Sequence, residues 1–181
     1  MMAARNTVTS FGWLTRALHW GTAALVLAAM PLGLWIARAE ISLSDLWLFG
    51  LHKSLGISVL VLTALRILWH RRSPPPDPLP AGPLADRLSR LVHRLFYAGL
   101  ILMPLSGWIA SSATGLDTVV FNRVTLPRIA PVSETWENAG FALHGTLGLV
   151  LIGLVVLHVV GAVSRAVGAR DRTLQRMIRG Q

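Results

Sequence analysis

Two short sequences in this chain pair a histidine with a glycine four residues later, His52-Lys53-Ser54-Leu55-Gly56 and His144-Gly145-Thr146-Leu147-Gly148. On a helix this spacing places both residues on one face, one turn apart. An imidazole can ligate iron, and a glycine leaves room for the face of a flat cofactor to approach the helix. The repeated pair is therefore typical of a porphyrin site.

Two further histidines complete the set. His158 follows His144 by fourteen residues, so both lie on one face of a helix, about 21 Å apart. His52 and His144 stand near one end of their apolar segments, whereas His19 and His158 stand near the opposite end. One buried histidine is usually an ordinary hydrogen-bonded polar residue, but four at two matched depths predict two bis-imidazole hemes. Such ligation leaves no open position on iron and favours electron transfer.

Zinc or copper is the competing interpretation of these histidines. A tetrahedral metal needs ligands that converge on one point, and four helical turns keep His144 and His158 from sharing an ion. The chain has no cysteine, which excludes thiolate ligands. Small residues near the proposed sites leave space for heme, although glycine also allows close helix packing in any membrane bundle. These residues are Gly21, Gly56, Gly145, Gly148 and Gly161.

The composition places these histidines in a membrane. Of the 181 residues, 53% are hydrophobic and 14% are charged, and the mean hydropathy is +0.57. A soluble domain of this size is far less apolar. Four stretches are long enough to cross a bilayer, at about 17–37, 46–69, 93–113 and 140–163. We expect an all-α integral membrane four-helix bundle in which residues 1–181 form a single domain.

Basic residues predict the orientation of the bundle. The net charge is +9, and most of the 17 basic residues lie before the first span, around the second loop and in the C-terminal tail. The positive-inside rule then puts both termini and the second loop in the cytoplasm. Because these residues flank apolar spans and form no compact basic domain, topology explains them better than nucleic-acid binding. The outer side holds Arg38, Lys53, Arg123 and Arg128.

The two longer connections have simple expected roles. The proline-rich stretch 73–80 should be a stiff, extended spacer on the cytoplasmic side and not a site. The outer loop 114–136 should lie over the mouth of the bundle. Its Val119, Val120 and Phe121 either cover an outer cofactor or anchor the loop at the membrane interface.

Several motifs together resemble the bacterial cytochrome b561 family, most closely its superoxide oxidase members. The motifs are Arg16-x-x-His19-Trp20, the 52–56 sequence, Pro104-Leu105-Ser106-Gly107-Trp108 and Asp171-x-Thr173-Leu174. The resemblance covers nearly the whole chain. It implies a four-helix protein of the bacterial inner membrane that links the outer aqueous side to the quinone pool. It also implies two b hemes, ligated by His19, His52, His144 and His158.

The resemblance also implies a reaction. Superoxide oxidases take an electron from superoxide at the outer heme and pass electrons to ubiquinone, so superoxide and ubiquinone are the expected partners, with no obligate protein partner evident. Arg38, Lys53, Arg123 and Arg128 form a basic outer patch that would attract a small anion. Acidic residues on the same side offset this charge, and an ordinary solvated surface is the alternative interpretation.

Two other functional classes stay open. One is a heme b electron-transfer subunit that links the quinone pool to a partner dehydrogenase or hydrogenase. The other is a membrane protein that holds heme without catalysing a reaction. Co-purification of a second polypeptide would favour the first, and failure of every electron donor and acceptor would favour the second.

His93 is a candidate quinone residue. It begins the third span at the depth of the inner pair, and a histidine that titrates near neutral pH can supply the protons that quinone reduction takes up. Ligation of iron in place of His19, or a position among the headgroups, are the alternatives. The chain departs from the family late in span four, where Arg165 stands in the region in which a second histidine is expected. His70 is most simply interfacial.

Two arginines are candidate partners of the heme propionates. Arg66 lies one turn inside the cytoplasmic end of span two, where an unpaired charge is costly. Arg16 precedes the first inner histidine. Snorkelling of both side chains to the headgroups is the alternative.

Overall fold

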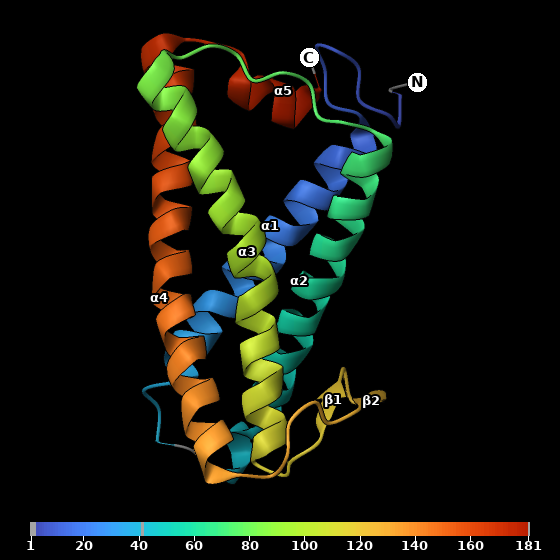
Figure 1. Ribbon diagram of the computed structural model, residues 1–181, viewed down its shortest axis with the longest axis vertical. Coiled ribbons are helices and arrows are strands. Elements are labelled where there is room, and N and C mark those ends of the chain that lie inside the picture. The colour runs from blue at the N-terminus through green and yellow to red at the C-terminus, as the bar shows by residue number, and fades with distance from the viewer. Residues whose placement is uncertain (1–2, 41, 181) are drawn as a thin grey trace.

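The computed structural model describes residues 3–40 and 42–180, which form four long helices that cross as one bundle (Figure 1). Helix α1 covers Trp13–Ile36, α2 Leu46–Arg72, α3 Pro83–Ala113 and α4 Glu134–Ser164. All four are long and apolar enough to span a membrane. α1 packs against α2, α3 packs against α4, and the two hairpins meet where α2 contacts α3. The expected four apolar helices of membrane-span length are confirmed.

The helices extend beyond the apolar stretches that predicted them. α3 begins at Pro83 instead of near residue 93, and α4 begins at Glu134 instead of near residue 140. Proline is favourable at the first helical position because its φ is already helical and its missing N–H needs no partner. Glu134 and Glu137 lie in the first turn of α4, where negative charge is stabilised by the helix dipole. Hydropathy detects the part of a helix that lies in lipid and misses its polar extension.

Four helices do not account for the whole fold. Strand β1, Thr118–Val120, pairs antiparallel with β2, Val124–Leu126, in the segment expected to be a loop. Its tight turn has positive φ at Phe121 and Asn122. A short 3-10 helix η1, Leu43–Asp45, precedes α2, and a π-helical turn η2, Arg165–Ala169, leads into a fifth helix α5, Thr173–Arg179. The four-helix expectation is corrected by these additions.

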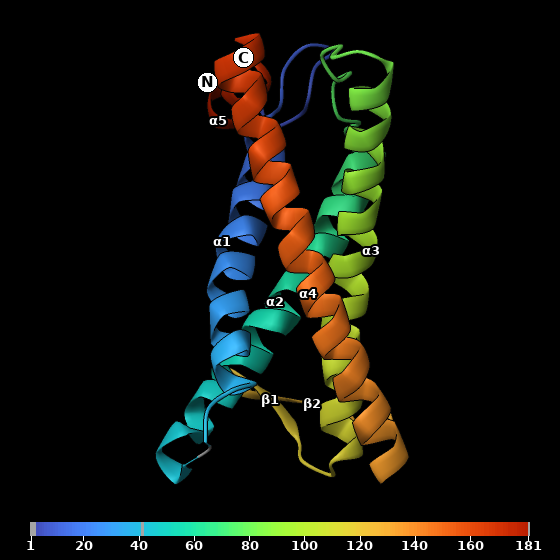
Figure 2. The same cartoon turned by 90° about the vertical axis from the view of Figure 1, so that its left-hand side faces the viewer.

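The two ends of the bundle differ in their covering. Both chain termini, the connection between α2 and α3, and helix α5 lie at one end (Figure 1). The connection between α1 and α2 and the β1–β2 hairpin lie at the opposite end (Figure 2). We call these the inner and outer ends.

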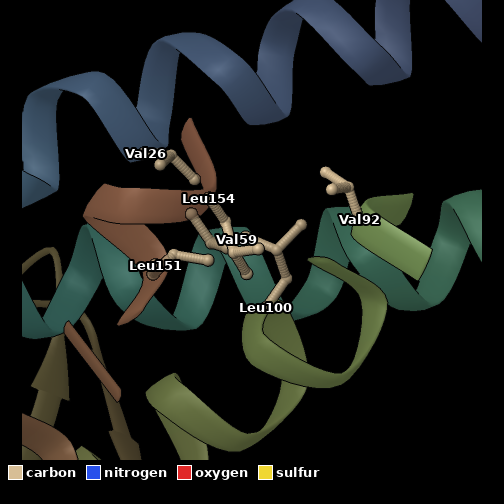
Figure 3. Close-up of a cluster of buried hydrophobic side chains, with 6 residues drawn as sticks. All are labelled: Val26, Val59, Val92, Leu100, Leu151 and Leu154. Atoms are coloured by element: carbon tan, nitrogen blue, oxygen red, sulfur yellow. The ribbon is translucent and has the colours of Figure 1, made fainter. Parts of the chain in front are cut away.

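The buried core is small and lies midway along the bundle. Figure 3 shows six side chains that pack there, with at least one from each long helix: Val26, Val59, Val92, Leu100, Leu151 and Leu154. Most other large apolar side chains point outward, as expected for a surface that faces lipid and not water. Buried Thr22, Ser54 and Thr63 donate to the carbonyls four residues earlier in their own helices, so their hydroxyls are satisfied.

The two helix hairpins have corresponding positions. We align α1 with α3 by matching Gly33 to Gly107, and α2 with α4 by matching His52 to His144. The core then matches as well: Val26 of α1 corresponds to Leu100 of α3, and Val59 of α2 corresponds to Leu151 of α4. The bundle is therefore internally repeated, with equivalent positions of both hairpins meeting in its centre.

Candidate heme sites

The outer histidine pair comes from the two corresponding helices α2 and α4. The ring centres of His52 and His144 lie 6.0 Å apart. An imidazole nitrogen binds a transition metal at about 2 Å and lies about 1 Å from its own ring centre, so an iron between two imidazoles separates the ring centres by about 6 Å. The spacing of the outer pair therefore fits bis-imidazole ligation of one iron.

Each outer histidine is pressed against a glycine of the neighbouring helix. A Cβ atom on Gly33 would lie 2.7 Å from Cε1 of His52, and one on Gly107 would lie 2.8 Å from Cε1 of His144. Real Cβ atoms essentially never approach another heavy atom so closely, so any larger residue would push the ring away. These glycines let the rings lie flush against α1 and α3 and so fix how far each ring reaches into the bundle.

The protonation of His144 is fixed by a backbone contact. Its Nδ1 lies 2.9 Å from the carbonyl oxygen of Met103, one turn before Gly107 on α3. Because a carbonyl can only accept a hydrogen bond, Nδ1 carries the proton and Nε2 keeps its lone pair. A ring held in this way presents Nε2 as a metal ligand, which is the usual arrangement of a ligating histidine.

The inner histidine pair comes from α1 and α4. The ring centres of His19 and His158 lie 6.3 Å apart, again the spacing for one iron between two imidazoles. Trp20 packs edge-on against His19 and Phe96 against His158, with ring centres 5.1 Å and 5.4 Å apart. Nδ1 of His19 is buried and has no hydrogen-bond partner among residues 3–40 and 42–180. The residues fit a second heme.

Two more polar groups converge on the inner pair. The ring centre of His93 lies 5.5 Å from that of His158, and its Nδ1 contacts the Ser89 carbonyl at 2.7 Å. The Arg66 guanidinium is close enough to both inner histidines to interact with them electrostatically. The inner end thus gathers three imidazoles and one guanidinium, whereas the outer end brings together two imidazoles.

The C-terminal tail covers the inner end and ties down the helix that carries His19. Arg16 Nη1 donates to the Ile178 carbonyl at 2.7 Å, and Trp20 Nε1 donates to the Met177 carbonyl at 3.1 Å. Both carbonyls belong to α5. Arg16 therefore supports the tail, a role that the sequence did not suggest, and its predicted contact with a propionate stays a prediction.

Arg165 and the proline-rich connector belong to the same cover. Arg165 forms an ion pair with Asp171 and donates to the Leu79 carbonyl at 2.8 Å, while Arg176 donates to the Asp77 carbonyl at 3.1 Å. The connector is therefore a docking segment for the tail, which corrects its interpretation as a mere spacer. Arg165, which stands where a second histidine was expected, is a structural residue.

The charge of Asp171 is held by its neighbours. Burial alone would raise the pKa of this carboxyl, but hydrogen bonds from Thr173 and the Arg165 guanidinium hold the pKa below its ordinary value. The carboxylate therefore stays ionised at every ordinary pH and keeps its ion pair with Arg165, the residue that also donates to the connector at Leu79.

The four outer basic residues do not form one uniform patch. Lys53 is half-buried beside His52, and Arg123 is exposed at the hairpin turn. The hairpin is fixed over α2 because the Phe121 N–H donates to Ser54 Oγ at 2.8 Å. Arg128 forms an exposed ion pair with Asp117 at 3.2 Å. Arg38 lines a shallow groove at the end of α1.

The glycines that touch the outer rings are not those that the sequence pattern singled out. A Cβ atom added to Gly56, Gly145 or Gly161 would meet nothing within 4 Å, so these positions are open, and their predicted role of leaving room for heme stays a prediction. The tight contacts with the outer rings come from Gly33 and Gly107 on the neighbouring helices. A signal for these two glycines was present, since Met-Pro-Leu followed by Trp-Ile, with a glycine between them, occurs in both spans, at residues 30–36 and 103–109, although the glycine stands one residue later in the second.

The competing metal site finds no counterpart in the described part of the chain. Across residues 3–40 and 42–180, no group of three or more His, Asp or Glu side chains is arranged to hold a metal ion. The spacing of His52 with His144 and of His19 with His158 suits an iron whose other four ligands come from a porphyrin, and His93 lies beside the inner pair.

Comparison with known proteins gives a consistent result. The model of the family described as prokaryotic cytochrome b561 matches residues 10–180. The chain is 33% identical to cytochrome b561 homolog 2 of Escherichia coli (strain K12) over 183 residues, which cover 98% of this chain and 95% of the relative. It is 27% identical to the probable superoxide oxidase CybB of Yersinia pestis over 133 residues, which cover 73% of this chain and 75% of that protein.

Proposed function

The chain belongs to the prokaryotic cytochrome b561 family of membrane proteins that bind heme b and transfer electrons, and we propose that it oxidises superoxide at its outer end and reduces ubiquinone at its inner end. The observation that carries this proposal is the presence of two histidine pairs, 6.0 Å and 6.3 Å between ring centres, at opposite ends of one bundle. Two b hemes bound there would carry single electrons from one membrane face to the other.

The histidine pairs would decide the type of chemistry at each site. His52 and His144 would hold the outer heme from both sides and leave no free position on iron, so the group would supply electron transfer to a small oxidisable molecule without binding it. His144 is locked by Met103 and Gly107, which keeps its ring fixed while the charge at the site changes. A rigid site of this kind suits rapid electron transfer without bond formation.

Superoxide is supported as the electron donor by charge and by one relative. Lys53 and Arg123 place positive charge at the outer end, which raises the encounter rate of a small anion. The Yersinia pestis relative is named a probable superoxide oxidase. Arg38 and Arg128 complete the proposed basic patch, with Arg128 contributing less because Asp117 offsets its charge.

Ubiquinone is proposed as the acceptor at the inner end. His93 lies against His158 on the same end as Arg66, so a quinone beside the inner heme would meet a hydrogen-bonding imidazole. Arg66, and Arg16 beyond its contact with α5, are proposed to pair with the propionates of the inner heme. His93→Ala should then retain both hemes and slow electron exchange with a ubiquinol analogue.

We place the protein in the bacterial inner membrane with both termini in the cytoplasm, as a single domain over residues 1–181. The termini, the α2–α3 connection and α5 share one end of the bundle (Figure 2). Most arginines lie in these segments or in the helix ends next to them, which supports the orientation through the positive-inside rule.

Stopped-flow spectroscopy of the purified protein tests the proposal. Superoxide should reduce the hemes rapidly, and added ubiquinone should return them to the oxidised state with continued consumption of superoxide. Superoxide dismutase should abolish the reduction. If superoxide leaves the hemes oxidised while ubiquinol reduces them, the protein is instead an electron-transfer subunit that serves a partner dehydrogenase or hydrogenase.

A further inference from the structure

At the inner end, two faces of the bundle that the internal repeat relates carry different residues. The inner histidines lie on α1 and α4, and the repeat relates that face of the bundle to the face formed by α3 and α2. On the α1–α4 face the corresponding positions are Ala23 and Ala162. On the α2–α3 face they are Tyr97 and His70. Small residues leave space beside the inner histidines, whereas the corresponding space on the other face is filled by two polar rings.

These two rings form a hydrogen-bonded pair. The Tyr97 hydroxyl lies 3.1 Å from Nδ1 of His70, and the guanidinium of Arg66 lies 5.6 Å from the centre of the Tyr97 ring. Nε2 of His70 and Nε of Arg66 are buried and have no hydrogen-bond partner among the described residues. Polar groups at this depth in a membrane protein are costly unless they serve a function.

The pair opens on a groove at the membrane-facing surface. The groove has a volume of about 340 Å³ and is lined by Ile67, His70, Arg71 and Tyr97. Leu65 and Leu68, on the same stretch of α2, have exposed fractions of 48% and 55% and so offer an apolar surface to lipid. A flat ring with polar oxygens and an apolar tail matches these surroundings, because the tail stays in lipid while an oxygen reaches the hydroxyl.

The residues of the groove also lie one helical turn from residues of the inner histidine cluster. Tyr97 lies one helical turn after His93 on α3, and His70 lies one turn after Arg66 on α2, so the members of each pair share a helix face. His93 contacts His158 directly. A continuous set of polar side chains therefore runs from the inner heme site to the groove.

We propose that this groove binds the ring of the quinone and that Tyr97 and His70 form the relay that protonates it. The inference rests on the proposed quinone reaction and adds its site. Reduction of one quinone to quinol takes two electrons, delivered singly from the inner heme, and two protons. The two protons go to the two carbonyl oxygens of the ring. At the oxygen that faces Tyr97, the Tyr97 O–H bond breaks as an O–H bond forms on the quinone, and His70 returns a proton from Nδ1 to Tyr97. The other oxygen takes its proton from water.

Arg66 and Arg71 support the relay without passing a proton themselves. The positive charge of Arg66 over the Tyr97 ring favours the moment at which the hydroxyl has lost its proton and the quinone oxygen has gained negative charge. Arg71 is exposed at the end of α2, so the last turn of this helix reaches the water from which His70 regains its proton.

The test begins with protein reduced by dithionite, so that its outcome does not depend on superoxide as donor. Reduced wild type is mixed with a short-tailed ubiquinone, and heme oxidation is followed by stopped flow. Tyr97→Phe removes only the hydroxyl, and His70→Leu removes the group that returns the proton to it. Each should slow oxidation by quinone at least tenfold, because general acid catalysis contributes about 10²–10⁴-fold. His70→Gln, which keeps a hydrogen-bond acceptor beside Tyr97, should also be slow.

Two controls separate the relay from a structural effect. Oxidation by ferricyanide, which takes an electron and no proton, should be unchanged in all three variants. Trp69→Phe removes a hydrogen bond to Thr15 Oγ1 of 2.9 Å at the same depth but outside the groove, and it should leave the quinone rate unchanged. Both hemes should keep their low-spin spectra in every variant.

Each outcome decides the proposal. Slow quinone oxidation with unchanged ferricyanide oxidation supports the relay. Wild-type rates in Tyr97→Phe and His70→Leu overturn it and leave the quinone reaction standing. Loss of the inner heme in these variants also overturns it, since the residues would then support heme binding. Wild-type hemes that quinone does not oxidise at all contradict the proposed function itself.

Discussion

The outer and inner histidine pairs are built in opposite ways. At the outer end the two ligands occupy corresponding positions of the two hairpins, and each ring rests against a corresponding glycine, Gly33 or Gly107. At the inner end the two histidines do not correspond to each other. His19 of α1 matches His93 of α3, and His158 of α4 matches Arg66 of α2. One end of the bundle follows the internal repeat and the other departs from it.

This difference fits two separate tasks. The outer end is suited to holding a cofactor, and the inner end is suited to exchanging protons as well as electrons. A symmetric site needs only two ligands and close packing, which suits a donor that leaves its electron and departs. Under the proposed function, the inner end also needs titratable groups for the protons that quinone reduction takes up. His70 and Tyr97 stand where the other hairpin has Ala162 and Ala23, so the departure from the repeat provides such groups.

The largest expected effect comes from removing one ligand from each end of α4. His144→Ala should abolish the outer heme and spare the inner one, and His158→Ala should do the reverse, because about 21 Å of helix separates them. Heme content by pyridine hemochrome assay, with spectra of the remaining heme, measures this. Loss of both hemes in either variant would show that the two ends are not independent.

The next effect tests the glycine contacts that distinguish the outer end. Gly107→Ala places a methyl group 2.8 Å from Cε1 and 2.9 Å from Nδ1 of His144. Overpacking of this kind costs about 1–3 kcal/mol, so heme affinity at the outer site should fall about 10- to 100-fold while the inner site is unchanged. Heme titration of the apoprotein measures both affinities.

Gly153→Ala is the matched control for that substitution. Gly153 lies on α4 between the two ligands of that helix, and a Cβ there meets nothing within 4 Å. It should bind heme at both sites like the wild type. Equal affinities in Gly107→Ala and Gly153→Ala would mean that the ring does not depend on its glycine.

The correspondence between the hairpins also explains which site residues the sequence could predict. The four histidines stand out in the sequence because each lies in an apolar span. The rise per residue of a helix then gives the depth of each histidine in the membrane. Gly33 and Gly107 were missed because each acts on a ring of another helix. Only the packing of α1 on α2 and α3 on α4 reveals such contacts.

Polar segments at both ends were predicted less well. Hydropathy gave no sign that α3 reaches back to Pro83 or that the tail forms α5, since these segments are stabilised by individual hydrogen bonds and not by apolar periodicity. The tail is held by contacts such as that of Arg176 with Asp77, across 99 residues of sequence. The contact of His70 with Tyr97 was not predicted, because the two residues lie on different helices.

A smaller effect should separate the basic residues of the outer end. Lys53→Gln should lower the rate of heme reduction by superoxide about two- to fivefold at low salt, since one charge a few ångströms away is worth about 1 kcal/mol or less in water. It should also flatten the salt dependence of that rate. Arg128→Gln should change the rate less, because Asp117 already offsets the charge of Arg128. Equal effects of both substitutions would argue against steering by Lys53.

The smallest effect concerns the ion pair of Asp171 with Arg165 at the inner end. Because the pKa of Asp171 is lowered in the folded protein, its stabilising contribution is complete above the ordinary pKa of about 4 and is lost as pH falls through the lowered value. Asp171→Asn should reduce stability by less than about 1 kcal/mol near neutral pH. The difference from wild type should vanish at low pH in thermal unfolding followed by tryptophan fluorescence.

The outer ion pair offers the comparison for that result. The side chains of Asp171 and Arg165 are each 21% exposed, whereas those of Asp117 and Arg128 are 56% and 48% exposed. Asp117→Asn should therefore change stability even less than Asp171→Asn. A larger effect at Asp117 would contradict the claim that the Asp171–Arg165 ion pair is the more stabilising of the two.

The most direct test of the account is the number and ligation of the hemes in the wild-type protein. Pyridine hemochrome assay against protein concentration should give two b hemes per chain. Electron paramagnetic resonance of the oxidised protein should show two distinct low-spin ferric centres, each with two imidazole ligands, because the outer and inner pairs differ in their surroundings. One heme per chain, or a high-spin centre with an open coordination position, would contradict two bis-histidine sites.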